Sequence, residues 1–277
     1  MSALSRTAGL AAARLGAFLR RDLREALSYK FTFVTSLAGI LFSTATFFFV
    51  AKLVPAGAPS LAPYGGDYFA FAVVGVAFSS LLGIFQAGLP SVIRSAQVSG
   101  TLEAVLVTPV SVPTVLVGSS LYSFGFQTVR TVLHLAVAVL VFGMALGPVN
   151  WAGVAAVFGL TALAFLSVGM LSASFILVYK LGNPFGWLLG GASGLLGGVV
   201  FPVSLLPPWL RWASSLLPVT YALDGMRRGL LARSSFAALV PDIVALAAFD
   251  AALLPLGLVL FRAAVRKAKR DGTLSHY

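Results

Sequence analysis

The stretch FTFVTSLAGILFSTATFFFV, residues 31–50, decides the fold, because it is mostly apolar and contains no charged residue. About 20 such residues are the length that an α-helix needs to cross the hydrocarbon core of a bilayer. The apolar part of a cleaved signal peptide is only ~7–15 residues long, and no small-residue cleavage site follows this run. We therefore interpret residues 31–53 as an uncleaved first membrane span.

The composition extends this interpretation to the whole chain of 277 residues. Hydrophobic residues make up 59% of the chain and charged residues only 10%, with a mean hydropathy of +0.98. Soluble domains carry roughly 25% charged residues. These values predict an all-α integral membrane protein that forms a single transmembrane domain over residues 1–277. The chain has no cysteine, which excludes disulfides and cysteine-based metal sites.

Apolar runs and the breaks between them predict six transmembrane helices. Their ranges are 31–53, 67–90, 113–146, 151–178, 184–201 and 240–261. At 1.5 Å per residue the third would reach about 50 Å, beyond the ~30 Å core, so it must tilt or project from the membrane. An amphipathic pattern over residues 9–29 predicts a helix in the inner membrane interface, and residues 262–277 form a basic tail.

Residues 202–235, between the fifth and sixth spans, are apolar but interrupted by prolines. The prolines are Pro202, Pro207, Pro208 and Pro218. Because proline starts or stops helices, we predict two short helices with a break near Pro218. They form either a hairpin that dips into the outer leaflet or two helices that lie flat outside. Asp224 has the helical spacing for an ion pair with Arg227 or Arg228.

The positions of the basic residues explain the net charge of +11. With the N-terminus inside, the basic residues of the inner segments are Arg6, Arg14, Arg20, Arg21, Arg24, Lys30, Arg94, Lys180, Arg262, Arg266, Lys267, Lys269 and Arg270. Those of the outer segments are Lys52, Arg211, Arg227, Arg228 and Arg233. Since Lys and Arg are enriched in cytoplasmic loops, we predict a multi-pass protein of the cell (inner) membrane with both termini cytoplasmic. Nucleic acid is not an expected partner.

Polar residues form a stripe along one face of the third span. Its members are Ser119, Ser123, Gln127, Arg130 and His134. Ionisable side chains within a membrane are costly and usually face the bundle interior or water. The stripe therefore predicts either the lining of a substrate route or a contact with another helix. Asp250, near the middle of the sixth span, is a candidate partner, and we hypothesise an ion pair between Arg130 and Asp250.

Glycines recur at every fourth residue of the fifth span. They are Gly186, Gly190, Gly194 and Gly198. Small residues at this spacing let two helix backbones approach closely within a membrane. We therefore expect helix packing on this face, either within the subunit or across a dimer.

The chain lacks motifs for chemistry of its own. No Gly-Lys dipeptide occurs, so the phosphate-binding P-loop pattern is absent. His134 and His276 are the only histidines, too few for a histidine-rich metal site. Nothing resembles a pair of nucleophile and base, so we expect no enzyme activity, no cofactor and no metal in this chain. If the protein does ATP-driven work, another chain supplies the ATPase.

Residues 97–111, QVSGTLEAVLVTPVS, lie between the second and third spans and are too polar to cross the membrane. Ser99 suits the N-cap of a short helix, Glu103 in the first turn suits the helix dipole, and Pro109 limits the helix end. These features predict a cytoplasmic helix over residues 99–108. On the residues alone, an interfacial helix without a partner is the alternative.

The segment SGTLEAVLVTPVS resembles the cytoplasmic segment between spans two and three of ABC-2-type ABC transporter permeases, the membrane subunits of drug and lipid exporters. The stretches FLRRDLREALSYK and FPVSLLPPWLRWASSLLPVTYALDGMR also resemble this family, so the resemblance covers nearly the whole chain. It implies that residues 99–108 form a coupling helix that sits in a cleft of a separate ATP-binding cassette subunit. The coupling residues would be Gly100, Thr101, Leu102, Glu103, Leu106, Thr108 and Pro109.

The resemblance further implies a second permease copy, in a homodimer or heterodimer, and partner ATPases that bind ATP and magnesium. An apolar pathway favours a hydrophobic or amphipathic substrate, such as a drug or a lipid-like molecule. The nearer alternative is an exporter of lipid-linked glycan or polysaccharide, which rows of aromatic side chains along the pathway would indicate. The rivals from other classes are an ion-gradient-driven carrier, with Asp250 and Asp242 as ion sites, and a scaffold without transport.

Overall fold

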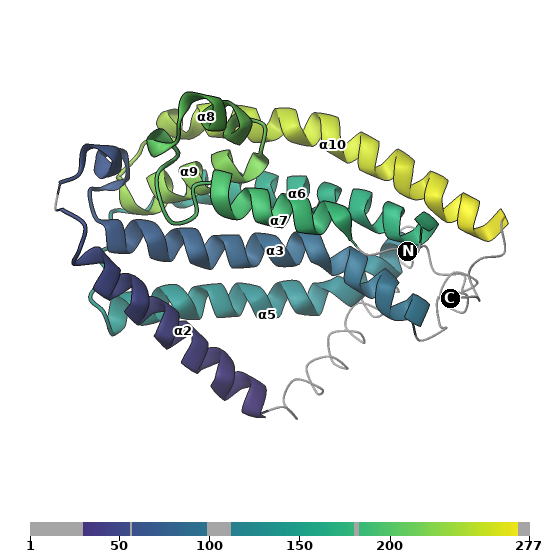
Figure 1. Ribbon diagram of the computed structural model, residues 1–277, viewed down its shortest axis with the longest axis horizontal. Coiled ribbons are helices and arrows are strands. Elements are labelled where there is room, and N and C mark those ends of the chain that lie inside the picture. The colour runs from purple at the N-terminus through teal and green to yellow at the C-terminus, as the bar shows by residue number, and fades with distance from the viewer. Residues whose placement is uncertain (1–29, 56, 99–111, 180–182, 271–277) are drawn as a thin grey trace, which may run out of the picture.

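The structure is a computed structural model in which every regular element of the described residues is a helix (Figure 1). The described residues are 30–55, 57–98, 112–179 and 183–270. The all-α prediction is therefore confirmed for this part of the chain. The predicted interfacial helix at 9–29, the predicted coupling helix at 99–108 and residues 271–277 of the predicted tail lie outside the described residues.

The helices form a bundle around α3 and α6. The larger helices are α2 (Lys30–Ala51), α3 (Tyr68–Val98), α5 (Val112–Leu140), α6 (Trp151–Tyr179), α7 (Pro184–Leu196) and α10 (Phe236–Arg270). The short ones are η1 (Pro59–Tyr64), η2 (Val203–Leu205), α8 (Pro208–Ser215) and α9 (Pro218–Leu231). α3 runs beside α5 and α6, α7 lies next to α3 and α6, and α10 packs along α6 (Figure 1). η1, α8 and α9 gather at the left end of this view.

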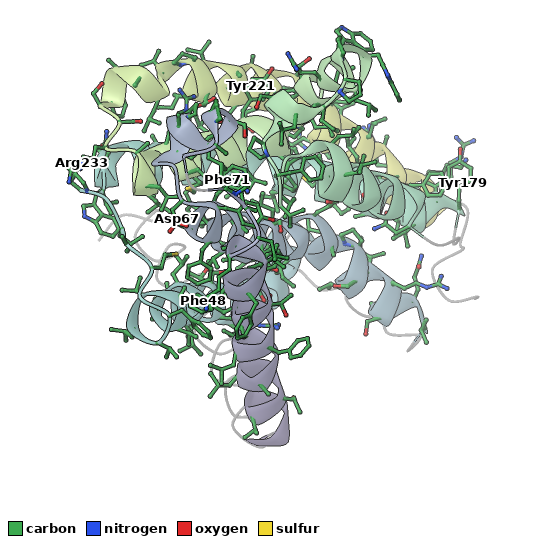
Figure 2. The ribbon with its side chains drawn as sticks, turned by 60° about the vertical axis from the view of Figure 1, so that its left-hand side comes forward. Phe48, Asp67, Phe71, Tyr179, Tyr221 and Arg233 are labelled. Carbon is green, nitrogen blue, oxygen red and sulfur yellow. The ribbon has the colours of Figure 1, made fainter. Side chains whose placement is uncertain are left out.

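Helix α2 extends away from the rest of the bundle (Figure 2). Its second half is anchored, because the Phe48 ring lies 5.5 Å from that of Phe69 on α3 and 5.3 Å from that of Phe142 after α5, between centroids. By contrast, Phe42 and Phe49 on the same helix are largely exposed. α2 therefore leaves an apolar surface that lipid or a second chain must cover.

Within the described ranges, four helices are long and apolar enough to cross a membrane, and they correspond to the first, second, fourth and sixth predicted spans. They cover Val34–Ala51, Tyr68–Val98, Trp151–Tyr179 and Phe236–Ala268. The third predicted span is α5, whose described apolar part is Phe124–Leu140. It ends earlier than the predicted residue 146, and Gly143 in the turn that follows has a positive φ of 70°. The six-span topology stays a prediction.

Helix α7 is shorter than the predicted fifth span at 184–201. The Asn183 side chain caps its start by accepting a hydrogen bond from the Gly186 N–H at 2.7 Å. The helix ends at Leu196, and Gly198 follows with a φ of 71°, a conformation that favours glycine. Its 13 residues reach only about 20 Å, less than the ~30 Å core. The chain then continues without α-helix to the start of α8.

The buried core has two parts along the long axis. The larger part joins α3, α6 and α9, and includes Phe78, Val157 and Leu223. The second part lies where α3 approaches Val98, and joins α3, α6 and α10. Its members are Leu89, Ile93, Met170, Ala173, Ile176, Leu177, Phe261, Ala264 and Ala268. The last turns of α3, which precede residues 99–111, are therefore packed firmly against two other helices.

Candidate functional site

A cavity with a volume of about 460 Å³ lies between α3, α6, α7 and α9. We call it the apolar cavity, because most of its wall surface is apolar. Its lining residues are Ser79, Ser80, Leu82, Gly83, Gln86, Phe165, Gly190, Ser193, Gly194, Val199, Val200 and Val219. Gln86 is 5% exposed, and its Nε2 has no hydrogen-bond partner among the described residues. The cavity can hold an apolar molecule with an occasional polar group.

The smaller cavity, of about 80 Å³, lies between α2, α3 and α5. We call it the polar cavity, since six of its lining residues are polar. They are Ser43, Ser80, Gln127, Arg130, Thr131 and His134. The structure thus brings Gln127, Arg130 and His134 of the predicted stripe to one wall. Ser119 and Ser123 lie in the part of α5 whose side chains are not described.

The hypothesised ion pair between Arg130 and Asp250 is wrong. Both Asp250 carboxylate oxygens are buried and have no hydrogen-bond partner among the described residues. Arg130 instead faces the polar cavity, which Asp250 does not line. The physical reason is the helix order, since α10 packs on α6 and α9 while α5 packs on α3 (Figure 1).

The predicted glycine face of α7 makes no close helix contact within the described subunit. A Cβ atom built on Gly190 or Gly194 meets no described atom within 4 Å, and both residues line the apolar cavity. Gly186 lies against its own cap, Asn183, and Gly198 lies beyond the end of the helix. Of the two predicted alternatives, packing within the subunit is therefore not observed.

Arg227 on α9 is a structural anchor that the sequence did not reveal. Its side chain is 2% exposed and lies 3.5 Å from the ring centroid of Phe71, which Figure 2 labels near the centre of the molecule. It donates to the carbonyl oxygens of Phe71 (3.0 Å), Gly198 (2.7 Å) and Val199 (2.6 Å). A buried backbone carbonyl without a hydrogen-bond partner is costly. Arg227 therefore satisfies the backbone that follows the early end of α7.

The close approach around Arg227 requires a glycine on α3. A Cβ atom at Gly75 would lie 2.0 Å from both Arg227 Nη2 and the Val199 carbonyl oxygen. Burial lowers the pKa of Arg227 from its usual value, while three carbonyl oxygens and the Phe71 ring favour the charged guanidinium. The run of glycines and prolines after Leu196 indicates carbonyl groups without helical partners, but it does not identify Arg227 as their donor.

Arg228, next to Arg227, belongs to a separate ion-pair network. Its guanidinium bonds to Asp224 at 2.8 Å and to Asp242 of α10. Tyr64 of η1 donates to Asp224 at 2.5 Å, and burial, followed by the Asp224 charge, raises the Tyr64 pKa. Of the two predicted partners of Asp224, Arg228 makes the ion pair. The network joins η1, α9 and α10 at one end of the bundle.

These features define a helical membrane protein with several apolar helices and a cavity-bearing face beside α3. The part of the chain that the structure describes contains no group of three or more His, Asp or Glu side chains able to hold a metal ion.

The family model described as ABC-2 type transporter matches residues 15–231, and the chain belongs to this family. The proteins named inner membrane transport permease YadH in Escherichia coli (strain K12) and in Shigella flexneri are both 28% identical to the chain over 168 residues. The alignment covers 61% of this chain and 65% of each relative. The resemblance noted in the sequence is thereby confirmed at the level of the family.

Proposed function

We propose that this chain is the permease subunit of an ATP-driven exporter in the inner membrane. In this function, two permease copies form the pathway, and separate ATP-binding subunits supply the free energy. The observation that carries the proposal is the family membership together with the apolar cavity, because the cavity has room for cargo and the chain has no P-loop of its own. Alternating access of this route to the two sides of the membrane would move the cargo.

The walls of the apolar cavity favour a hydrophobic or amphipathic cargo, such as a drug or a lipid-like molecule. Leu82, Val199 and Val200 contribute aliphatic surface, and Phe165 is the single aromatic side chain among the described lining residues. A pathway for glycans would be expected to present several aromatic side chains for sugar rings. This lining supports lipid-like cargo over lipid-linked glycan.

Coupling to the ATPase would act through residues 99–111, which join α3 to α5. α3 lines both cavities, and α5 lines the polar one. Near its end α3 is tied to α6, because Gln97 Nε2 donates to the Ile176 carbonyl oxygen at 3.4 Å. A displacement of the coupling segment would therefore move α3 together with α6 and α10, and change the shape of the route.

The open glycine face of α7 supports a dimer contact. Gly190 and Gly194 have no described neighbour within 4 Å of a built Cβ atom, and α2 also exposes apolar side chains. A second permease copy would cover these surfaces and close the apolar cavity into a pathway. The same surfaces would serve a homodimer, with a second copy of this chain, or a heterodimer, with a related permease.

The experiment is co-purification followed by transport in proteoliposomes. The tagged chain should bring down an ATP-binding subunit, and the complex should move an amphipathic dye only with ATP. Glu103→Lys should lower ATP-driven transport at least tenfold while ATPase activity persists, because it reverses the one charge of the coupling segment, and Glu103→Asp should be close to wild type. Full transport by the lone chain would contradict the exporter and favour an ion-gradient carrier. Unchanged transport by Glu103→Lys would remove Glu103 from coupling.

A further inference from the structure

We propose that the polar cavity binds a compact anionic group, phosphate or carboxylate, whose apolar tail occupies the apolar cavity. The inference rests on the proposed function and deepens it, since it defines the cargo as an anionic amphiphile. It is drawn from the side chains of α5 and from the way the two cavities meet.

The polar cavity presents donors and a positive charge. Arg130 and Gln127 carry N–H groups, and His134, 7% exposed, has a buried Nε2 without a hydrogen-bond partner among the described residues. None of its described lining residues is acidic. The hydroxyl groups of Thr131 and Ser80 already donate to backbone carbonyls, at 3.4 and 2.8 Å. The donors of the cavity without such a bond among the described residues are the side-chain nitrogens of Gln127, Arg130 and His134 and the hydroxyl of Ser43.

An anion is the ligand that such a wall favours. A cation within a membrane span is costly unless it is paired or hydrated. The guanidinium of arginine binds carboxylate and phosphate through two parallel hydrogen bonds, and charge-assisted bonds of this kind are the strong ones. The described ion pairs leave Arg130 without a carboxylate, and Asp250 does not supply one. A bound anion would meet this requirement.

The size of the cavity agrees with a compact group. A water molecule needs at least ~10–15 Å³ of the same measure of volume, so 80 Å³ holds about five waters or a group of about five heavy atoms. A phosphate group has that number of heavy atoms, and a carboxylate group has fewer. A larger head group would have to remain outside.

The two cavities are neighbours on α3. Ser80 lines both, and Gly83, one helical turn further on, is exposed and lines the apolar cavity. By the helical period, Ala77 faces the polar side and Gln86 faces the apolar side, and Ser80 lies between them. A molecule with a charged end and an apolar tail can therefore occupy both cavities by lying across Ser80.

The test measures binding of radiolabelled dodecyl phosphate to the complex of permease and ATP-binding subunits in a neutral detergent. Dodecyltrimethylammonium, with the same tail and a positive head, and inorganic phosphate, with no tail, serve as competitors. We expect unlabelled dodecyl phosphate to displace the label at a concentration at least tenfold lower than either competitor. Equal competition by the cationic amphiphile would overturn the anion site, and equal competition by inorganic phosphate would overturn the joint use of the cavities.

Variants assign the site. Arg130→Gln should weaken dodecyl phosphate binding about 10- to 100-fold, and Arg130→Lys should retain most of it. The matched control is Arg262→Gln, which removes an exposed arginine of α10 far along the chain from either cavity. Gly83→Leu changes a residue that lines the apolar cavity but not the polar one, and should weaken dodecyl phosphate while leaving inorganic phosphate unchanged. Wild-type binding by either Arg130→Gln or Gly83→Leu would overturn the proposal.

The source of the anion is decided by the lipids that co-purify with the complex. A phospholipid that dodecyl phosphate displaces from wild type, and that Arg130→Gln does not carry, supports a bilayer lipid as cargo. A phospholipid that dodecyl phosphate cannot displace would assign the site to a structural lipid and overturn the cargo role. Failure of the proposed function is distinguishable, because anion binding would then persist in a chain that binds no ATP-binding subunit.

Discussion

The replacement of Arg227 by methionine tests the anchor that holds the irregular chain after α7. Methionine keeps much of the apolar stem of arginine but removes every donor, so the carbonyl groups of Gly198 and Val199 lose their bonds. The Phe71 carbonyl lies within α3 and keeps its helical bond. Each buried group left without a partner costs ~1–3 kcal/mol, so we expect a loss of about 2–6 kcal/mol.

The assay compares the unfolding of purified variants in the same detergent. The matched control is Arg211→Met on α8, because Arg211 also donates to two carbonyl groups, those of Ser204 (2.7 Å) and Leu206 (3.1 Å), but is exposed. Water can replace its bonds, so its loss should cost at most about 1 kcal/mol. Equal stability of Arg227→Met and Arg211→Met would refute the role of Arg227 as an anchor.

Three further tests use substitutions on α3, α7 and α10. Gly75→Ala should destabilise the subunit as strongly as Arg227→Met, because the new methyl group falls 2.0 Å from Arg227 Nη2 and the Val199 oxygen. Gly83→Ala, with open space around it, should be neutral, and equal unfolding temperatures for the two glycine variants would contradict this packing. Asp250→Asn should leave stability unchanged or raise it because its carboxylate has no partner among the described residues, while Asp242→Asn should cost about 1–3 kcal/mol by breaking the pair with Arg228. The reverse order of stability in a denaturation series would contradict the assignment, and loss of transport in Asp250→Asn alone would favour an ion-coupled carrier. Gly194→Leu should keep the unfolding temperature of the isolated subunit but weaken dimerisation, measured by cross-linking in membranes, and an unchanged cross-linking yield would exclude α7 from the dimer contact.

Hydropathy and proline positions were sufficient to predict which segments are helical, but not where α7 ends. Residues 197–201 are as apolar as those before them, so composition places them in the same span. The helix stops at Leu196 because Gly198 takes a positive φ and because Arg227, distant in sequence, bonds to the carbonyl groups released there. The sequence near Gly198 does not indicate that a side chain of another helix, Arg227 of α9, will bond to these carbonyl groups.

For the candidate site, the sequence predicted which residues share a helix face but not which helices pack against that face. The helical period grouped Gln127, Arg130 and His134 on one face, and the structure places them at one cavity. The partner of Arg130 was not predictable, because two residues at the same predicted depth in the membrane can lie on opposite sides of the bundle. Asp250 lies at a similar depth by span count, yet α6 and α3 separate α10 from α5 (Figure 1). Likewise, the sequence placed Arg227 among the basic residues of an outer segment, whereas in the structure its side chain is buried against Phe71.

The most direct test of the exporter is transport by defined components. The purified chain is reconstituted in inside-out proteoliposomes with and without its ATP-binding subunit, and uptake of a fluorescent anionic amphiphile is followed after addition of ATP or of an ion gradient. The account predicts uptake that requires both the ATP-binding subunit and ATP. Uptake by the chain alone under an ion gradient, at the same rate and without ATP, would contradict it.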